Sequence, residues 1–289
     1  MKPAPFDYVA PDTIEEACSV LAAAGGGATV LAGGQTLVPL LNLRMSQPFV
    51  IVDINRIAEL KGTVRVDGCT RIGPMTRQCE VIADKALARD LPVVVEAVRH
   101  VGHHQTRNRG TIGGSIALGE PAAELPATAV ALGASIHVRS IRGARIVPAN
   151  EFYLGPYMTV LDADELVTSI SFPDWPKGHT ILFREVAQRP GDFALVGMVG
   201  ALSVEVGKIT RVGLAWFGMG PTPIRAKTAE QMLLGQAIGG IDALAVAERA
   251  ITDTAPFDDH HASAEYRRTV GKRIFARTLR EALDLREVA

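Results

Sequence analysis

The sequence predicts an α+β protein of two domains, and three observations lead to this prediction. Apolar strand patterns alternate with helical patterns up to Asp53, which is typical of a small parallel sheet. After residue 180 strand patterns come first and helical patterns follow, which is typical of an α+β domain. Between these regions Pro173–Gly178 combines two prolines with a glycine. We therefore expect domains at 1–176 and 177–289, the first divided into lobes of about 1–57 and 58–176.

The N-terminal lobe is expected to hold a β-α-β arrangement. Asp12 and Glu15 have the spacing of a capping box and predict the start of a helix. Its apolar face would consist of Ile14, Ala17, Cys18 and Leu21. Strands are predicted at Ala28–Ala32 and Phe49–Asp53, with a short helical segment between them at Leu37–Met45, broken at Pro39. Asp53 is interpreted as a turn residue at the strand end rather than as a ligand.

The second lobe is expected to combine strands with helices. Asp67-Gly68 predicts the turn of a hairpin that covers Thr63–Gly73. The expected helices are Arg77–Arg89, Pro92–Val101 and Pro121–Leu132, and the expected further strands are Ser135–Ser140, Arg145–Val147 and Glu165–Phe172.

The second domain is expected to contain a three-stranded antiparallel sheet and helices. The strands are Ile181–Val186, Leu195–Val206 and Ile209–Met219, and the helices are Thr228–Leu234, Asp242–Thr252 and Ala264–Leu285.

The composition restricts the class of protein. With 289 residues, of which 47% are hydrophobic, the chain can bury ample core, and a formal net charge of −1 leaves no basic footprint for nucleic acid. Cys18, Cys69 and Cys79 are odd in number and lack metal-binding spacing, which indicates reduced structural thiols and no iron–sulfur site. Neither a signal peptide nor an apolar run of membrane-spanning length is present, so we expect a cytoplasmic protein without a membrane span.

Two glycine-rich segments are the strongest candidates for a binding site. One is Leu31–Val38, with Gly33 and Gly34, and the other lies within Arg107–Pro126, with the pair Gly113 and Gly114. Glycine lets backbone N–H groups approach a ligand closely, and successive inward N–H groups suit a phosphate. The alternative is an ordinary surface turn. Together, two such segments could hold the two phosphates of a dinucleotide, although neither fits the Rossmann or P-loop pattern.

Other groups of reactive residues are weaker candidates. His100, His103 and His104 precede the second glycine segment and could bind a metal, but a solvated helix end explains them better. No catalytic triad, Cys-His pair or carboxylate pair can be located, so we assign neither a catalytic residue nor a metal ligand.

Ala32-Gly-Gly-Gln-Thr36 followed by Thr111-Ile-Gly-Gly-Ser115 resembles the FAD-binding medium subunit of the molybdenum hydroxylases. Further similar stretches are Arg107–Gly110, Arg189–Leu195 and Ser263–Arg268. The family includes carbon monoxide dehydrogenase, xanthine dehydrogenase, and the nicotine and quinoline dehydrogenases. The resemblance implies a two-lobed PCMH-type FAD-binding domain followed by a smaller medium-subunit domain.

The resemblance also implies which residues bind FAD. Backbone amides of the two segments would bind the pyrophosphate: Ala32, Gly33, Gly34, Gln35, Thr36 and the adjoining Leu37, with Thr111, Ile112, Gly113, Gly114 and Ser115. Glu124 stands where the family often has an Asp that contacts the adenosine end, and Val167 matches a backbone contact. Arg184 matches a basic residue that approaches the flavin ring; the alternative is a solvent-facing strand residue.

The same resemblance implies partners. Molybdenum cofactor would lie on a large molybdopterin subunit and two 2Fe–2S clusters on a small subunit, assembled as a dimer of heterotrimers. This chain would receive electrons on FAD and pass them to an external acceptor. Two alternatives remain: a self-sufficient flavoenzyme with the same FAD-binding fold, and a nucleotide-binding regulatory module.

Overall fold

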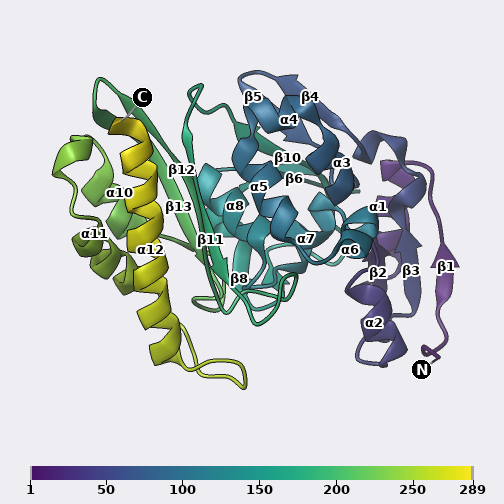
Figure 1. Cartoon of the computed structure of the whole chain (residues 1–289). Helices are drawn as coiled ribbons and strands as arrows, with labels where there is room; N and C mark the ends of the chain where they lie inside the picture. The colour runs from purple at the N-terminus through teal and green to yellow at the C-terminus, as the bar shows by residue number, and fades with distance from the viewer. Residues whose placement is uncertain (1, 288–289) are drawn as a thin grey trace.

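The computed structural model describes residues 2–287, so the outer ends of the two expected domains, Met1 and Ala289, lie outside the described residues. Figure 1 shows a small N-terminal lobe, a central lobe and a C-terminal part side by side. Each contains its own sheet, with three, five and four strands, and a two-stranded ribbon completes the set. The mixture of strands and helices confirms the predicted α+β class.

The N-terminal lobe contains the predicted parallel sheet, with one strand more than expected. β2 (Ala28–Leu31) and β3 (Val50–Asp53) run parallel, and β1 (Asp7–Val9) adds to β3 on its other side. β1 has only three residues, two of them exposed, and therefore lacks an apolar pattern that could predict it.

Both helices of this lobe differ from the prediction, α1 in its capping residue and α2 in its unbroken course and its end at Asn42. α1 (Ile14–Ala23) is capped by Thr13 rather than Asp12, because the Thr13 hydroxyl accepts the N–H of Glu16 at 3.2 Å. α2 (Leu37–Asn42) contains Pro39 without a break. A proline in the first turn removes an N–H that has no helical partner in any case.

The central lobe is built on an antiparallel sheet of strand order β4-β5-β10-β6-β7. Its strands are β4 (Thr63–Val66), β5 (Cys69–Ile72), β6 (Ser135–Ser140), β7 (Gly143–Pro148) and β10 (Leu166–Pro173). The predicted hairpin turn is confirmed, since Asp67 and Gly68 have φ of 50° and 72°. A small ribbon, β8 (Tyr153–Gly155) with β9 (Met158–Thr159), follows the short helix α9 (Ala149–Phe152).

Six helices belong to this lobe: α3 (Gln78–Ala83), α4 (Lys85–Asp90), α5 (Pro92–His100), α6 (His104–Arg109), α7 (Ile112–Leu118) and α8 (Glu124–Leu132). Of these, α7 and α8 contact β10 of the sheet. The single helix predicted at Arg77–Arg89 is wrong, because the Asp84 carboxylate accepts the N–H groups of Ala86 and Leu87 and starts a second helix. α6 was not predicted, and neither was α7, because the pair Gly113 and Gly114 was interpreted as part of a loop.

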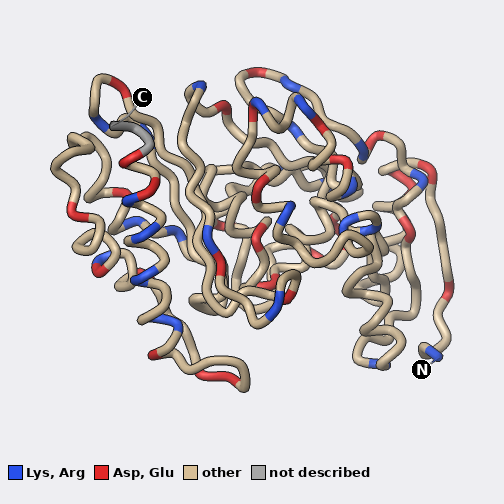
Figure 2. Tube along the Cα trace, viewed as in Figure 1, with Lys and Arg blue, Asp and Glu red and all other residues tan. Residues whose placement is uncertain are grey.

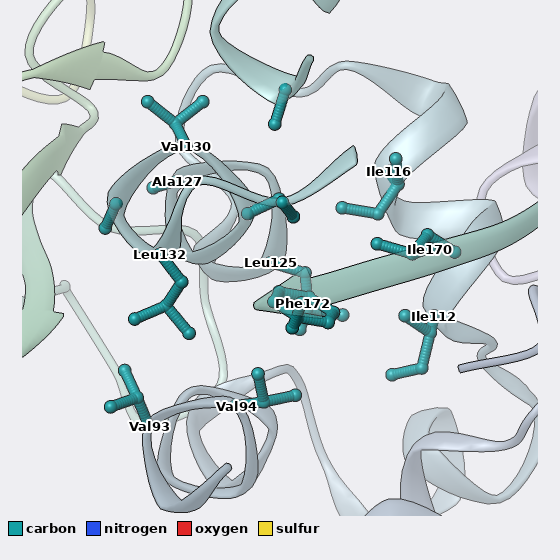
Figure 3. Close-up of a cluster of buried hydrophobic side chains, with 14 of the residues drawn as sticks. Val93, Val94, Ile112, Ile116, Leu125, Ala127, Val130, Leu132, Ile170 and Phe172 are labelled. Atoms are coloured by element: carbon teal, nitrogen blue, oxygen red, sulfur yellow. The ribbon is translucent and has the colours of Figure 1, made fainter. Parts of the chain in front are cut away.

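The core of the central lobe lies between these helices and the sheet. Figure 3 shows side chains of α5, α7, α8 and β10 gathered into one cluster, with Ile112, Leu125 and Phe172 close together. All three are almost completely buried. Burying one such side chain stabilises the fold by about 1.5–3 kcal/mol, so the N-terminal end of α7 is firmly anchored.

The C-terminal part has a four-stranded sheet, one strand more than predicted. It consists of β11 (Thr180–Val186), β12 (Val196–Glu205), β13 (Lys208–Phe217) and the two-residue β14 (Ile224–Arg225). The helices are α10 (Lys227–Leu233), α11 (Ala243–Ala250) and α12 (Ala264–Glu287), close to the predicted ranges. Short 3-10 turns occur at Ile54–Arg56, Ala58–Leu60, Ile238–Gly240 and Ile251–Asp253.

This four-stranded sheet is buried on both faces. Leu182, Met198 and Trp216 pack with α10, α11 and α12 on one face. Val199 and Phe217 point the other way and belong to the core of the central lobe, against α8. Figure 1 shows the sheet standing between α12 and α8. The two predicted domains therefore share one layer.

Charged residues of both signs are distributed over the chain. Figure 2 shows acidic and basic residues mixed along the whole trace. None of the helices within residues 2–287 is both long enough and apolar enough to cross a bilayer.

Candidate functional site

The first glycine segment, Ala32–Leu37, connects β2 to α2 and has a conformation that requires glycine. Gly34 has a φ of +71°, in the left-handed region that residues with a side chain rarely adopt. A Cβ added to Gly33 would lie 2.5 Å from the carbonyl oxygen of Arg109 and 2.9 Å from Cα of Gly110. The segment therefore packs its backbone directly against the chain that leads to the second glycine segment.

The amides of the first segment are unpaired. Within the described residues, the N–H groups of Gly33, Gly34, Gln35 and Thr36 donate no hydrogen bond. Unpaired backbone donors cost free energy unless water or a ligand accepts them. Four such groups in succession, two of them on glycine, make this segment a set of donors for an anion.

The second glycine segment, Thr111–Ser115, is the first turn of α7 rather than a loop. Its amides already have acceptors. Ile112 N–H donates to the Thr76 carbonyl at 3.1 Å and Gly113 N–H to the Pro74 carbonyl at 2.8 Å. The Gly114 N–H donates to Oγ1 of Thr111 at 3.0 Å, and the Ser115 N–H to the Thr111 carbonyl at 3.3 Å. The expected cradle of free amides is thus present in the first segment and absent from these four positions of the second.

The two segments nevertheless lie side by side, as the sequence predicts. A Cβ added to Gly114 would come within 3.7 Å of Cβ of Ala32 and within 2.8 Å of Oγ1 of Thr111. The side-chain hydroxyl of Ser115 is half-buried and makes no hydrogen bond to the described residues. It remains available to a ligand bound at the first segment.

A hollow of about 300 Å³ opens beside the first segment. Its lining includes Gly33, Gly34, Asp53, Asn55 and Arg109. A larger hollow of about 740 Å³ lies elsewhere, on the polar outer face of the central sheet, and none of the predicted site residues lines it. The smaller hollow is therefore the candidate site.

A hydrogen-bonded network holds the wall of this hollow. Asn55 donates from Nδ2 to the carbonyl of Ala32 at 2.9 Å and to Oδ1 of Asp53 at 2.5 Å. The Tyr8 hydroxyl donates to Oδ2 of Asp53 at 2.5 Å. Burial alone would raise the pKa of Asp53, but these hydrogen bonds outweigh it, so that its pKa is lowered and the carboxylate stays ionised. Asp53 is both a strand-end residue, as interpreted, and a fixed anchor for the first segment.

The remaining predicted residues lie apart from the hollow. Glu124 is the first residue of α8 and only 3% exposed, and burial raises its pKa to about 8. The negative charge of Glu185 raises this pKa further, and the charge of His100 opposes the shift. Val167 is a buried member of β10 that pairs with Val138.

Arg184 does not point toward the central lobe. It donates to Oγ1 of Thr278 at 3.2 Å and to Oε2 of Glu281 at 2.5 Å, both on α12. The neighbouring Glu185 points the opposite way, with Oε1 3.3 Å from Nδ1 of His100. Successive side chains of a strand point to opposite faces of the sheet, which explains why Arg184 and Glu185 point in opposite directions. The sequence match identified Arg184 by its position along the chain, but it did not show on which face of β11 the side chain lies.

The functional residues that sequence reasoning missed are Asn55 and Arg77, which tie the segments together. Asp53-Ile-Asn55 at the end of a strand is a detectable signal, since polar residues at strand ends often line sites. Arg77 had no such signal, because its role depends on contacts with Asn55 and Arg109 that only the fold creates.

Comparison with known proteins decides the family. Residues 4–175 match the FAD binding domain in molybdopterin dehydrogenase, and residues 181–282 match the CO dehydrogenase flavoprotein C-terminal domain.

The chain belongs to the family of FAD-binding subunits of molybdopterin dehydrogenases.

Its relatives and solved structures span nearly the whole chain. The 6-hydroxypseudooxynicotine dehydrogenase complex subunit alpha of Paenarthrobacter nicotinovorans is 38% identical over 98% of this chain and 96% of its own. The carbon monoxide dehydrogenase medium chain of Hydrogenophaga pseudoflava is 34% identical, with 98% of each chain covered. A carbon monoxide dehydrogenase structure from H. pseudoflava superposes with a TM-score of 0.94 at 35% identity, covering 98% of both chains. The structure of quinoline 2-oxidoreductase from Pseudomonas putida 86 superposes with a TM-score of 0.91 at 33% sequence identity, covering 98% of this chain and 99% of its own.

These findings confirm the resemblance drawn from the two glycine segments. The protein is an oxidoreductase subunit of the molybdenum hydroxylase family with an FAD-binding domain. Among the described residues no group of three or more His, Cys, Asp and Glu side chains could hold a metal ion. The unpaired amides and the hollow beside them fit the phosphates of FAD.

Proposed function

We propose that this chain binds FAD through the first glycine segment and passes electrons from iron–sulfur clusters of a small subunit to an external acceptor. The observation that carries the proposal is the run of four unpaired amides, Gly33 to Thr36, beside the hollow. Such donors stabilise a phosphate by about 1.5–3 kcal/mol each. Bound FAD supplies the redox chemistry, and the protein supplies binding and orientation.

The second segment contributes differently. With its amides used internally, Thr111–Ser115 offers the free Ser115 hydroxyl and a rigid surface against Ala32. Ile112 and Gly113 support the segment from within the fold. Leu37 follows Thr36 as the first residue of α2 and continues the row of unpaired N–H groups.

Three predicted residues are proposed in narrower roles. Glu124 is a buried acid of α8, and Glu185 is a half-buried residue of β11 beside His100. A flavin ring that reached His100 would meet Glu185 rather than Arg184, which is bound to α12. Val167 supports the sheet. The pairing register of β10 with β6 shifts between Val167 and Ser169, and there the backbone of Val167 could contact the cofactor.

The partners are proposed from the family. A large subunit would carry the molybdenum cofactor and a small subunit two 2Fe–2S clusters, with the whole assembled as a dimer of heterotrimers in the cytoplasm. The domain boundary is proposed near Pro176, between the two matched family regions.

Purification with the partner subunits tests the proposal. We expect heat or acid to release flavin from the complex, and phosphodiesterase to convert it to FMN. Under anaerobic conditions, substrate should bleach the flavin absorbance only when all three subunits are present. Bleaching in the isolated chain would contradict the electron-outlet role and favour a self-sufficient flavoenzyme. Absence of flavin from the complex would contradict the binding role.

A further inference from the structure

Two arginines come together beside the first glycine segment. The guanidinium of Arg77 donates to the side-chain carbonyl of Asn55 and to the backbone carbonyl of Arg109. Burial lowers the pKa of Arg77, and the positive charge of Arg109 lowers it further. The two guanidinium groups are thus near enough to repel each other.

Arg109 is the cation without a partner in this group. It lines the hollow, is exposed, and its guanidinium forms neither an ion pair nor a hydrogen bond within residues 2–287. Arg77, in contrast, is fixed in place by its two acceptors. Electrostatic repulsion between two neighbouring cations is relieved when an anion binds between or beside them.

The acidic groups nearby are held by hydrogen bonds of their own. The Asp53 carboxylate accepts hydrogen bonds from Tyr8 and Asn55. It forms no ion pair with Arg109, although the positive charge of Arg109 helps to lower the pKa of Asp53. Glu80 accepts the backbone N–H of Arg77 at 2.7 Å, as part of the start of α3. Among Asp53, Arg77 and Arg109 two positive charges therefore meet one ionised carboxylate, which leaves one positive charge in excess.

The position of Arg109 is fixed by its backbone. Its carbonyl accepts from Arg77 and lies against Gly33, so close that no Cβ fits between them. The backbone of Arg109 is thus fixed directly beside Gly33, while its exposed side chain is free to orient.

We propose that Arg109 is the cationic ligand of the cofactor's pyrophosphate, in the hollow that it lines together with Gly33 and Gly34. This inference rests on the proposed FAD site and adds a side chain to a site otherwise made of backbone. Arginine suits this role because its planar fork can donate two parallel hydrogen bonds to phosphate oxygens.

The test is FAD binding to the complete complex after its flavin has been removed. Loss of a hydrogen bond to a charged group corresponds to about ten- to hundredfold in affinity, so we expect Arg109→Gln to raise the Kd for FAD by that factor. Arg109→Lys keeps the charge and should recover part of the loss. Added salt should weaken FAD binding by the unsubstituted protein more than by Arg109→Gln.

Arg89→Gln is the matched control. Arg89 is exposed, and within residues 2–287 its one ion pair is with the adjacent Asp90, so this variant loses the same charge away from the hollow. Thermal unfolding of each flavin-free variant shows that it is folded. A Kd for Arg109→Gln within twofold of the unsubstituted protein, or equal to that of Arg89→Gln, overturns the assignment of Arg109. An unsubstituted complex that takes up no FAD would instead contradict the proposed function itself.

Discussion

The two glycine segments look alike in sequence and differ in what their glycines do. In Ala32–Leu37 the amides are unpaired and Gly34 has a positive φ. In the second segment the amides of residues 112–115 are bonded internally. Its glycines permit close packing, since a Cβ on Gly113 would lie 2.7 Å from Cα of Pro74. One pair of glycines exposes the backbone to a ligand, and the other removes side chains so that the backbone can be buried. A Gly-Gly motif alone does not distinguish these uses.

The largest effect should come from Gly113→Ala. The added methyl must displace the backbone of Pro74, and overpacking of this kind destabilises a fold by about 3 kcal/mol. Urea unfolding of the flavin-free chain measures the change. FAD affinity of the fraction that remains folded should be nearly normal. A stable Gly113→Ala protein that has lost FAD would show that both segments act as ligand donors and would erase the contrast.

The second-largest effect should be on the pH dependence of stability, through the buried Glu124 at the start of α8. The folded-state pKa of Glu124 is about 8, above its ordinary value of 4.5. Stability contributed by the protonated form is therefore fully present below pH 4.5 and is lost as the pH rises toward 8, at up to about 1.4 kcal/mol per pH unit. Glu124→Gln, which cannot ionise, should flatten the fall in unfolding free energy between pH 5 and pH 8. If the unfolding free energy falls equally steeply with pH in Glu124→Gln and in the unsubstituted protein, Glu124 is not a buried ionisable group.

The smallest change in stability should come from Gly34→Ala. Holding a residue with a side chain in the left-handed region costs about 1–2 kcal/mol, and the neighbouring Val38 and Leu31 side chains can move aside. FAD affinity should fall at the same time, because any relaxation of the backbone misplaces the unpaired amides. Fluorescence titration with FAD and urea unfolding, run on Gly34→Ala and Gly113→Ala together, provide the direct comparison. Unchanged FAD affinity in Gly34→Ala would mean that the open amides are not the binding surface.

Several features could be predicted from sequence because they depend on local patterns. The hairpin at Asp67-Gly68, the parallel pair β2 and β3, and the strand-then-helix order of the C-terminal part follow from turn chemistry and apolar periodicity. The nearness of the two glycine segments was inferred correctly from their shared chemistry.

Other features depend on tertiary contacts. The α7 helix begins at glycines with low helix propensity, and it is stable because Ile112 and Ile116 are buried in the central core. The orientation of Arg184 followed from which face of β11 meets α12, and no local pattern contains that information. The role of Arg109 required knowledge that Arg77 approaches from a distant part of the chain.

The doubly buried sheet has a consequence for how the chain responds to stress. Val199 and Phe217 of the C-terminal part complete the core around α8 of the central lobe. The central lobe and the C-terminal part are the two halves of this shared core, and neither half retains a full core without the other. Melting of one half would expose the apolar face of the other, and the chain should unfold in a single cooperative transition. A swing of one half about the Pro173–Gly178 connection would break the same contacts. Electrons would thus pass through a fixed frame, in which the separation between flavin and partner clusters is set by assembly rather than by domain motion.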